Sequence, residues 1–495
     1  MPPPNGQVPA ASVRANLERV DELLGHPLDL ATEIHGPDGC AGLAYITGLS
    51  DAADLKSHLL LPLLQLLSAA PRTPEDLARL LPETSPRPCQ AMDDILESLL
   101  QGRAVLFLEG HAAALSFATQ GWTRRPPKEP ESERVIRGPR EGFTETLDEN
   151  VAMIRRWIKD SRLRADLLEI GRRTRTGVAV VYLSDVAQPS LVGEVKKRLS
   201  AIDLDGVIES GYLEQLIKDR RASIFPLTQA TERTDKAAAA VLEGRVAILA
   251  DKSPFAILVP VTVNELYQSA EDYYFDFWLG GFLRLVRLLG NNLAVALPGL
   301  YVALAAVHPG LLPTQFALAL AAARLRIPIP LVAEVLLLEL AVEFFREAGL
   351  RLPGMIGQTL GIVAGVVVGI TSVQAGIVSP ATLVVVAVTA IASFTGPNYA
   401  MGIAWRLLKY ILLFAAAAFG LYGMTIAGML ILAHAADVKS FGVSFLAPWA
   451  PLQWTELADA PIRAPFWLKW RRPATYRPQD RLRTGGAKRE DEDHG

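Results

Sequence analysis

Apolar residues are distributed unevenly along this 495-residue chain, and their spacing changes at about residue 290. Before that point, short apolar runs alternate with polar stretches that contain glycine and proline, a pattern typical of α/β domains. After it, long apolar runs cover approximately 290–307, 327–345, 355–375, 381–395 and 410–433. Because one helical crossing of a bilayer needs about 20 apolar residues, the pattern predicts an α/β region followed by an α-helical, multi-pass membrane domain.

The α/β region contains an internal repeat. A hairpin that opens at Gly102-Arg103 has a counterpart that opens at Gly244-Arg245, 142 residues later, and Glu109 of the first turn corresponds to Asp251 of the second. Strand-like and helical patterns precede both hairpins in the same order. The repeat predicts two duplicated α/β subdomains; the alternative is a pair of independent hairpins that share a turn.

These patterns divide the chain into seven parts. Two weaker apolar runs, 311–323 and 441–454, are too short to be counted as spans and are candidates for re-entrant segments, so the number of crossings lies between four and six. The expected parts are a flexible N-terminus (1–39), a first α/β subdomain (40–123), a linker and helix (124–160), a second α/β subdomain (161–270), an interfacial aromatic helix (271–289), a transmembrane domain (290–455) and a cytoplasmic tail (456–495).

Charge and composition indicate the cellular location. The net charge of -3 gives no basic excess for binding nucleic acid. The first 20 residues lack the apolar core of a secretory signal, so we expect the large N-terminal region in the cytoplasm. The tail contains four basic residues, Lys469, Arg471, Arg472 and Arg477. Because basic residues favour the cytoplasmic side, the tail is predicted to be cytoplasmic too, and the number of crossings must then be even.

A glycine at every fourth position marks one predicted span. Gly357, Gly361, Gly365 and Gly369 lie within a stretch, 352–405, that has no charged side chain. This spacing leaves a bare stripe on a helix and lets neighbouring helices approach closely. The opposite face of the same helix carries polar residues near its ends and β-branched residues between them, which is the pattern of a narrow pore with a hydrophobic gate. The alternative is simple packing of a buried span; the candidate pore-lining residues are Thr359, Val363, Val366, Ile370 and Gln374.

Three carboxylates fall in the apolar run 327–345. Glu339 and Glu343 share a helical face, whereas Glu334 lies on roughly the opposite face. Carboxylates at membrane depth are costly, so they are expected to face protein, a cavity or a cation path, or another subunit. Alternatively the helix is partly interfacial, with local pairs from Glu343 to Arg346 and from Glu347 to Arg351.

Motifs of enzymes are missing from the sequence. It contains no Walker A loop, no Gly-x-Ser-x-Gly motif and no ligand spacing for a metal, and its two cysteines, Cys40 and Cys89, suggest no disulfide framework. We therefore predict no catalytic residues, no metal and no cofactor, and a protein that is not an enzyme.

Eight segments carry motifs that can be compared with a known family. They are 137–145 (RGPREGFTE), 231–235 (TERTD), 244–260, 271–274 (EDYY), 297–304 (LPGLYVAL), 346–353 (REAGLRLP), 356–363 (IGQTLGIV) and 389–394 (TAIASF). Together they resemble the A subunits of spore germinant receptors, the GerA family. The similarity covers roughly residues 40–440, although the acidic-glycine pair that is common in the second hairpin turn is replaced by Asp251-Lys252. The sporulation protein SpoVAF shares most of these motifs.

The resemblance implies a germinant receptor subunit in the spore inner membrane. Such a subunit assembles with a transporter-like B subunit, which binds the nutrient, and a lipoprotein C subunit, and forms a homo-oligomeric ring that conducts cations when nutrient binds. Alternatives are a SpoVAF-like accessory channel subunit, a solute or ion transporter in which Glu334 and Glu339 bind the coupling ion, and a non-conducting membrane scaffold.

Overall fold

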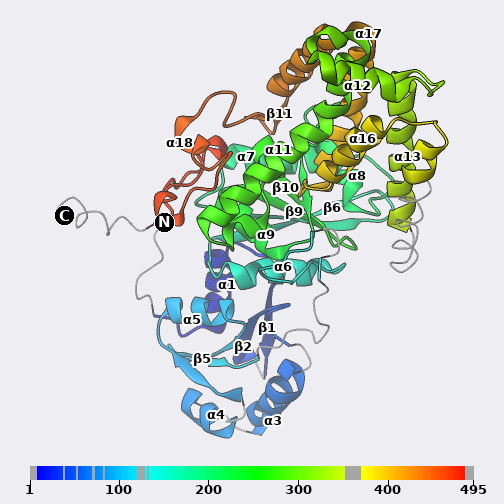
Figure 1. Cartoon of the computed structure of the whole chain (residues 1–495). Coiled ribbons are helices and arrows are strands. Elements are labelled where there is room, and N and C mark those ends of the chain that lie inside the picture. The colour runs from blue at the N-terminus through cyan, green and yellow to red at the C-terminus, as the bar shows by residue number, and fades with distance from the viewer. Residues whose placement is uncertain are drawn as a thin grey trace.

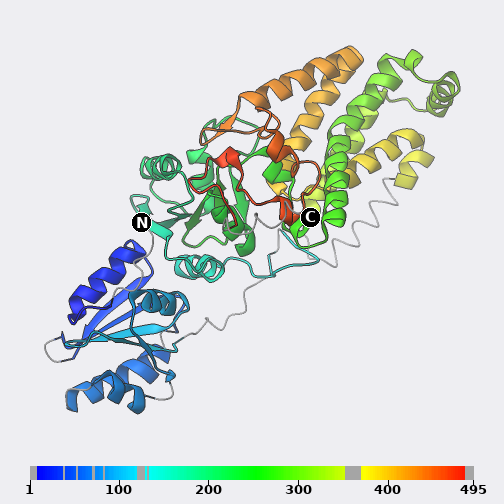
Figure 2. The same cartoon turned by 90° about the vertical axis from the view of Figure 1, so that its left-hand side faces the viewer.

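The computed structural model describes residues 8–36, 39–51, 54–69, 73–81, 84–119, 129–130, 133–351 and 369–484. Two α/β units follow one another along the molecule, and the apolar helices extend beyond the second unit (Figures 1 and 2). The first unit is blue, the second is cyan to green, and the helical part runs from green to orange.

The first α/β unit has a five-stranded sheet between two layers of helices. Alternate residues of its strands point to opposite faces, so that Val105 and Phe107 contact α1 and α5 whereas Leu106 and Leu108 contact α3 and α4. The strand order is β1-β2-β4-β5-β3, with all neighbours antiparallel. Its elements are α1 (Val13–Leu24), β1 (Leu30–His35), β2 (Ala41–Ile46), a π-helical turn (Leu55–Leu60), α3 (Leu61–Ala69), α4 (Pro74–Leu80), β3 (Arg87–Cys89), α5 (Met92–Leu100), β4 (Ala104–Leu108) and β5 (Ala114–Phe117).

The second α/β unit repeats this architecture. Its strand order, β6-β7-β9-β10-β8, matches that of the first sheet strand for strand, and the elements β3, α5, β4 and β5 each have a counterpart 142 residues later. The predicted duplication therefore extends to the pairing of the strands. The elements are α6 (Leu147–Trp157), β6 (Leu163–Ile170), β7 (Thr176–Leu183), α7 (Pro189–Ser200), α8 (Ser210–Ile217), β8 (Gln229–Thr231), α9 (Thr234–Leu242), β9 (Val246–Ala250) and β10 (Ala256–Val259).

The prediction of a flexible N-terminus at 1–39 is wrong for most of the residues that the structure describes there. Helix α1 and strand β1 occupy this region and belong to the first unit, because Val13, Leu17 and Val20 are spaced so that one face of α1 packs on the sheet. Helix α6 is the counterpart of α1, so it belongs to the second unit and not to a linker at 124–160.

An asparagine in each of these two helices supports their equivalence. Asn16 of α1 exchanges two hydrogen bonds of 2.7 Å with the backbone of Ala10, six residues earlier. Asn150 of α6 exchanges the same pair with Thr144, also six residues earlier and also at 2.7 Å. The duplicated unit therefore includes the segment that leads into its first helix.

Two helices of the described part are long and apolar enough to cross a membrane. They are Phe277–Val307, which comprises α11 (Phe277–Val302) and a π-helical turn (Ala303–Val307), and α17 (Tyr399–Asp437). The predicted run at 381–395 forms α16 (Pro380–Ser393), which is shorter than a span, and the run at 327–345 forms α13 (Leu331–Arg351), which carries several charges. Most of the run at 355–375 lies outside the described residues. Four to six crossings stay a prediction.

Two of the predicted membrane segments have a different structure. The interfacial helix expected at 271–289 does not exist as a separate element, because α11 begins at Phe277 and continues without interruption after a 3₁₀ turn (Ala270–Tyr273). The run 441–454 is not a re-entrant helix. It consists mainly of turns and the short strand β12 (Val443–Ser444), which pairs with β11 (Lys439–Ser440) just before the run. The Phe445 carbonyl accepts a 2.7 Å hydrogen bond from Val263 N.

The remaining helices connect these elements. The second weak run, 311–323, forms α12 (Thr314–Arg324), which follows a 3₁₀ turn (Pro309–Leu311) and has no buried residue. Helix α10 (Val263–Tyr267) precedes α11, and the short α15 (Ser372–Gln374) precedes α16.

The predicted tail packs against the second α/β unit. Gln479 N donates a 2.9 Å hydrogen bond to Val186 O, and Arg472 Nε donates one of 2.9 Å to Leu242 O. Figure 2 shows this red segment between the second unit and the base of the helices. Its elements are α18 (Trp454–Leu457) and two 3₁₀ turns, Phe466–Leu468 and Ala474–Tyr476.

Candidate functional site

The predicted pore helix lies mainly outside the described residues, which include neither Gly357, Gly361 and Gly365 nor Thr359, Val363 and Val366. The described end of that helix has two different sides. A Cβ built on Gly369 would lie 3.9 Å from Leu383 Cδ2 of α16, so the glycine faces this neighbour. Ile370 is 55% exposed and Gln374 is also exposed, so these two candidate pore residues have no covering partner within the described chain.

The predicted intramembrane carboxylate Glu339 forms a buried ion pair. Its Oε2 lies 2.5 Å from Nζ of Lys409, which is on α17, and only 2% of the Glu339 side chain and 6% of the Lys409 side chain are exposed. The second carboxylate oxygen, Oε1, is buried without a hydrogen-bond partner among the described residues. A cavity of about 10 Å³, close to the minimum for one water, touches Lys409. Glu339 Oε1 could therefore still accept a hydrogen bond or contact a cation inside the helical region.

Glu343 occupies the same face of α13, as predicted, and also contacts α17. It forms ion pairs with Arg406 and, at 3.4 Å, with Arg346. Arg346 Nη2 continues the chain of contacts with a 2.6 Å hydrogen bond to Ser393 Oγ of α16. The predicted local pairs, from Glu343 to Arg346 and from Glu347 to Arg351, are therefore both present.

Glu334 is fully buried on the other side of α13. Its Oε1 accepts a 2.5 Å hydrogen bond from Ser379 N, at the start of α16, and its Oε2 lies 3.4 Å from Arg324 Nη2. The carboxylate thus lies at the positive end of a helix dipole, which favours a negative charge. All three predicted carboxylates are engaged within this chain, and their role in function stays a prediction.

Sequence reasoning missed a charged network that joins the 3₁₀ turn 270–273 to α11 and the tail. Asp272 is fully buried and pairs with Arg284 at 3.2 Å and with Arg287 at 3.0 Å. Arg284 Nη1 also donates a 2.5 Å hydrogen bond to Asp459 O of the tail. The signal in the sequence that could have revealed it is the pair Arg284 and Arg287 at the beginning of an apolar helix. A buried arginine without an acidic partner is strongly destabilising, so the two arginines indicate a carboxylate nearby.

A second network holds the segment 133–140, here called the signature loop, against the second α/β unit. Arg233 is buried and makes two hydrogen bonds to Asp235, at 3.0 and 2.6 Å, and its Nη2 donates a 3.1 Å bond to Pro139 O of the loop. Tyr274 donates a hydrogen bond to Asp235 from the other side. Burial and this bond raise the pKa of Tyr274 above its ordinary value. The RGPREGF and TERTD motifs are therefore in contact, and Tyr274, three residues before α11, joins them through Asp235.

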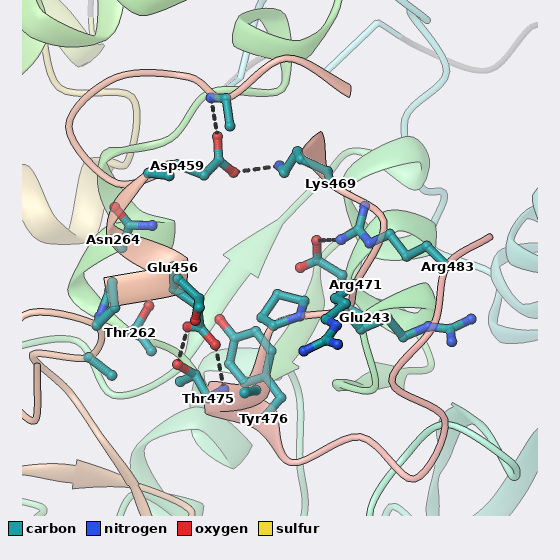
Figure 3. Close-up of a pocket in the computed structure, with 18 of the residues that line it drawn as sticks. Glu243, Thr262, Asn264, Glu456, Asp459, Lys469, Arg471, Thr475, Tyr476 and Arg483 are labelled. Atoms are coloured by element: carbon teal, nitrogen blue, oxygen red, sulfur yellow. Dashed lines mark hydrogen bonds and ion pairs between the residues drawn. The ribbon is translucent and has the colours of Figure 1, made fainter. Parts of the chain in front are cut away.

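The tail covers a cavity of about 380 Å³ on the second α/β unit (Figure 3). Its lining has mixed charge, because Glu243 pairs with Arg483 and Asp459 pairs with Lys469, while Glu456 accepts a hydrogen bond of 2.9 Å from Thr475 N. Burial and the nearby Glu265 raise the pKa of Glu243. In the described part of the chain, no group of three or more His, Cys, Asp or Glu side chains could hold a metal ion.

A duplicated α/β region, two helices of the described part that are suited to a membrane, and ion pairs between helices define a protein with an α/β head and a helical membrane-type region. The family model described as "Bacillus/Clostridium GerA spore germination protein" matches residues 18–475. The chain belongs to the GerA family of spore germination proteins, which are not enzymes.

Relatives match most of the chain. Spore germination protein KA of Bacillus subtilis is 39% identical over 89% of this chain and 81% of its own length. Spore germination protein B1 of the same organism is 39% identical over 90% of this chain and 92% of its own length, and the B. subtilis membrane protein YfkQ is 38% identical over 91% and 88%, respectively. The crystal structure of the N-terminal domain of the A subunit of the Bacillus megaterium germinant receptor GerK3 is 30% identical, covers 52% of this chain and 97% of that domain, and has a TM-score of 0.41.

Proposed function

We propose that the chain is the A subunit of a nutrient germinant receptor, which oligomerises in the spore inner membrane and forms a nutrient-gated cation channel. The observation that carries this proposal is the match to spore germination proteins over most of the chain, at up to 39% identity. The transporter-like B subunit and the lipoprotein C subunit, which the GerA resemblance implies, are the proposed partners.

The surface of the long helices supports a membrane location with neighbouring subunits. Large apolar side chains of α17, such as Phe414, Phe419 and Tyr422, are exposed, and the exposed side chains of α11 include Leu289 and Leu293. An apolar surface of this extent is stable only against lipid or protein. Membership of a ring would cover part of it, and the bilayer would cover the rest.

The ion pairs of α13 indicate the part of the proposed channel at which the passage of cations is controlled. Each charge of a buried pair has lost its hydration, so the pair is costly and is better explained by function than by stability. In the proposed closed state, Lys409 neutralises Glu339. A movement of α13 relative to α17 would release the carboxylate, whose Oε1 already lacks a partner in the described chain, for contact with a passing cation.

Ile370 provides the test of the pore. The receptor, reconstituted with its partner subunits in vesicles, would be compared as wild type, as Ile370→Ala, and as Ile391→Ala, a control at another exposed isoleucine, on α16. A wider hydrophobic gate would leak cations without nutrient, so we expect cation efflux from Ile370→Ala alone.

The alternatives differ in this assay. Equal impermeability of all three proteins, with normal assembly, would contradict the pore assignment and favour a scaffold. Channel activity that needs neither the B subunit nor nutrient would favour a SpoVAF-like accessory channel, and saturable solute uptake driven by an ion gradient would favour a transporter.

A further inference from the structure

Exposed apolar side chains gather where the tail meets the first turns of α11. This aromatic rim consists of two residues of α11 and four of the tail, and each of the six is between 49% and 74% exposed. Scattered exposed hydrophobics are normal, but a contiguous group marks a contact with a protein or a membrane. The members are Trp278, Phe282, Ile462, Phe466, Trp467 and Leu468.

Direct packing joins the two parts of the rim. The ring of Trp467 meets that of Phe277 edge to face, with centroids 5.5 Å apart, and Phe277 in turn contacts Trp278 at 4.9 Å. A Cβ on Gly281 would lie 3.0 Å from Ile462 Cγ2, so the tail lies directly on a glycine of α11. Arg463 Nη1 donates a 2.7 Å hydrogen bond to Phe275 O and holds the tail in this position.

The position of the rim along the helix places it near the surface of a bilayer. The helix Phe277–Val307 has 31 residues, which corresponds to about 46 Å at 1.5 Å per residue, whereas the hydrocarbon core is about 30 Å thick. One end must therefore lie outside the core. The first turns contain Arg284 and Arg287, paired with the buried Asp272, so this charged end is the one that belongs at the level of the lipid headgroups.

The residues next to the rim are suited to the same location. Tryptophan and other aromatic side chains prefer the membrane interface, where one part of the ring is apolar and another is hydrated. Arg471 stacks on the ring of Trp470, 4.0 Å from its centroid, and no ion pair joins it to a carboxylate in the described chain. Arg471 itself is exposed and follows Leu468 of the rim by three residues, so its charge complements the anionic headgroups of a lipid surface.

We propose that the aromatic rim is a membrane-interface anchor, through which the tail inserts Phe466, Trp467 and Leu468 at the boundary between headgroups and acyl chains. The proposal rests on the proposed membrane crossing of α11. It gives the tail two contacts, one with the second α/β unit and one with lipid, so that the tail fixes the height of the α/β region above the bilayer.

Spin labels can test the depth of the rim in the full-length protein. The chain has two cysteines, Cys40 and Cys89, and their replacement by serine gives a background for Trp467→Cys and, separately, Leu468→Cys. Leu300→Cys on α11 serves as the membrane control, and Ile208→Cys in the second α/β unit as the aqueous control; both residues are exposed. The labelled proteins would be placed in vesicles that contain phosphatidylglycerol, and collisions with oxygen and with a water-soluble nickel chelate would be measured.

We expect the labels at 467 and 468 to favour oxygen over the chelate, with a ratio between those at 300 and 208. If both rim labels were as accessible to the chelate as the label at 208, while the label at 300 favoured oxygen, the anchor would be refuted and the membrane crossing would stand. Rim labels shielded from both reagents would indicate a protein contact and would also refute it. A label at 300 that favoured the chelate would refute the crossing itself and the anchor with it.

Discussion

Glu339 of α13 and Lys409 of α17 form a buried ion pair, with Oε2 2.5 Å from Nζ. The pair joins a charged helix to one of the two helices in the described part of the chain that are apolar and long enough to cross a membrane. In a low-dielectric interior, each charge stabilises the other only as long as both are present. This relationship explains how α13 carries a carboxylate inside an apolar region.

Removal of one charge of this pair should destabilise the protein far more than removal of both. We expect Glu339→Gln or Lys409→Met to cost about 3–5 kcal/mol, because an unpaired buried charge is left behind, and the double variant to recover most of this loss. Thermal unfolding in detergent would measure it, with Glu347→Gln as the control because its pair with Arg351 is exposed and is worth at most about 1 kcal/mol. Additive losses in the double variant would contradict the interpretation.

Replacement of Arg233 should release the signature loop. Lysine cannot reproduce the two parallel hydrogen bonds to Asp235 together with the bond to Pro139 O. One charged hydrogen bond contributes about 1.5–3 kcal/mol, so we expect Arg233→Lys to speed tryptic cleavage after Arg137 or Arg140 at least about tenfold. Limited proteolysis with mass analysis of the fragments would detect this.

The matched control for that experiment is Arg162→Lys. Arg162 pairs with Asp160 at 2.6 Å, but its side chain is exposed, so the substitution should leave cleavage of the loop unchanged. If Arg233→Lys were cleaved at the wild-type rate, the loop would be held by contacts other than this clamp.

A kink in α17 depends on glycine. Gly420 has a φ of 61°, and a Cβ there would lie 2.7 Å from His308 Cδ2 and 2.9 Å from Val307 Cγ1. We expect Gly420→Ala to lose about 1–3 kcal/mol from its positive-φ backbone alone, with a further loss from these contacts, and therefore a lower melting temperature.

Gly428 of the same helix provides the comparison, because a Cβ there meets nothing within 4 Å. Gly428→Ala should raise the stability by about 0.5–1 kcal/mol, since alanine is the better helix former. If the two substitutions had equal effects, the kink at Gly420 would not be a fixed feature of α17.

Glu209 should make the second α/β unit sensitive to acid. Burial alone would raise the pKa of Glu209, but hydrogen bonds from Ser210, Gly211 and Ser253 hold it below its ordinary value. A lowered pKa contributes stability that is present above the unfolded-state value of about 4.3 and is lost as the pH falls through the folded-state value. Glu209→Gln should therefore flatten the acid limb of a plot of unfolding midpoint against pH; an unchanged acid limb would show that other carboxylates dominate it.

Local periodicity was sufficient to predict many elements and the duplication of the α/β region. The hairpins that follow Gly102 and Gly244 were recognisable because an acidic turn between two apolar runs is a local signal. Helix α1 was missed because its apolar residues are separated by charged ones, and its packing face appears only against β2 and β4. The long α11 was predicted as two elements because Arg284 and Arg287 interrupt its apolar run, and their partner Asp272 lies on another element.

The sequence alone determined that the chain has an α/β region followed by apolar helices, that the α/β unit is repeated, and that Glu334, Glu339 and Glu343 are unusual, because these properties depend on neighbours along the chain. Only the tertiary structure decided which charges meet. Lys409 and Arg406 reach α13 from α17, and Asp459 reaches Arg284 from the tail. Such partners are set by how helices and loops pack, and the energy of a buried charge depends on the partner it finds there.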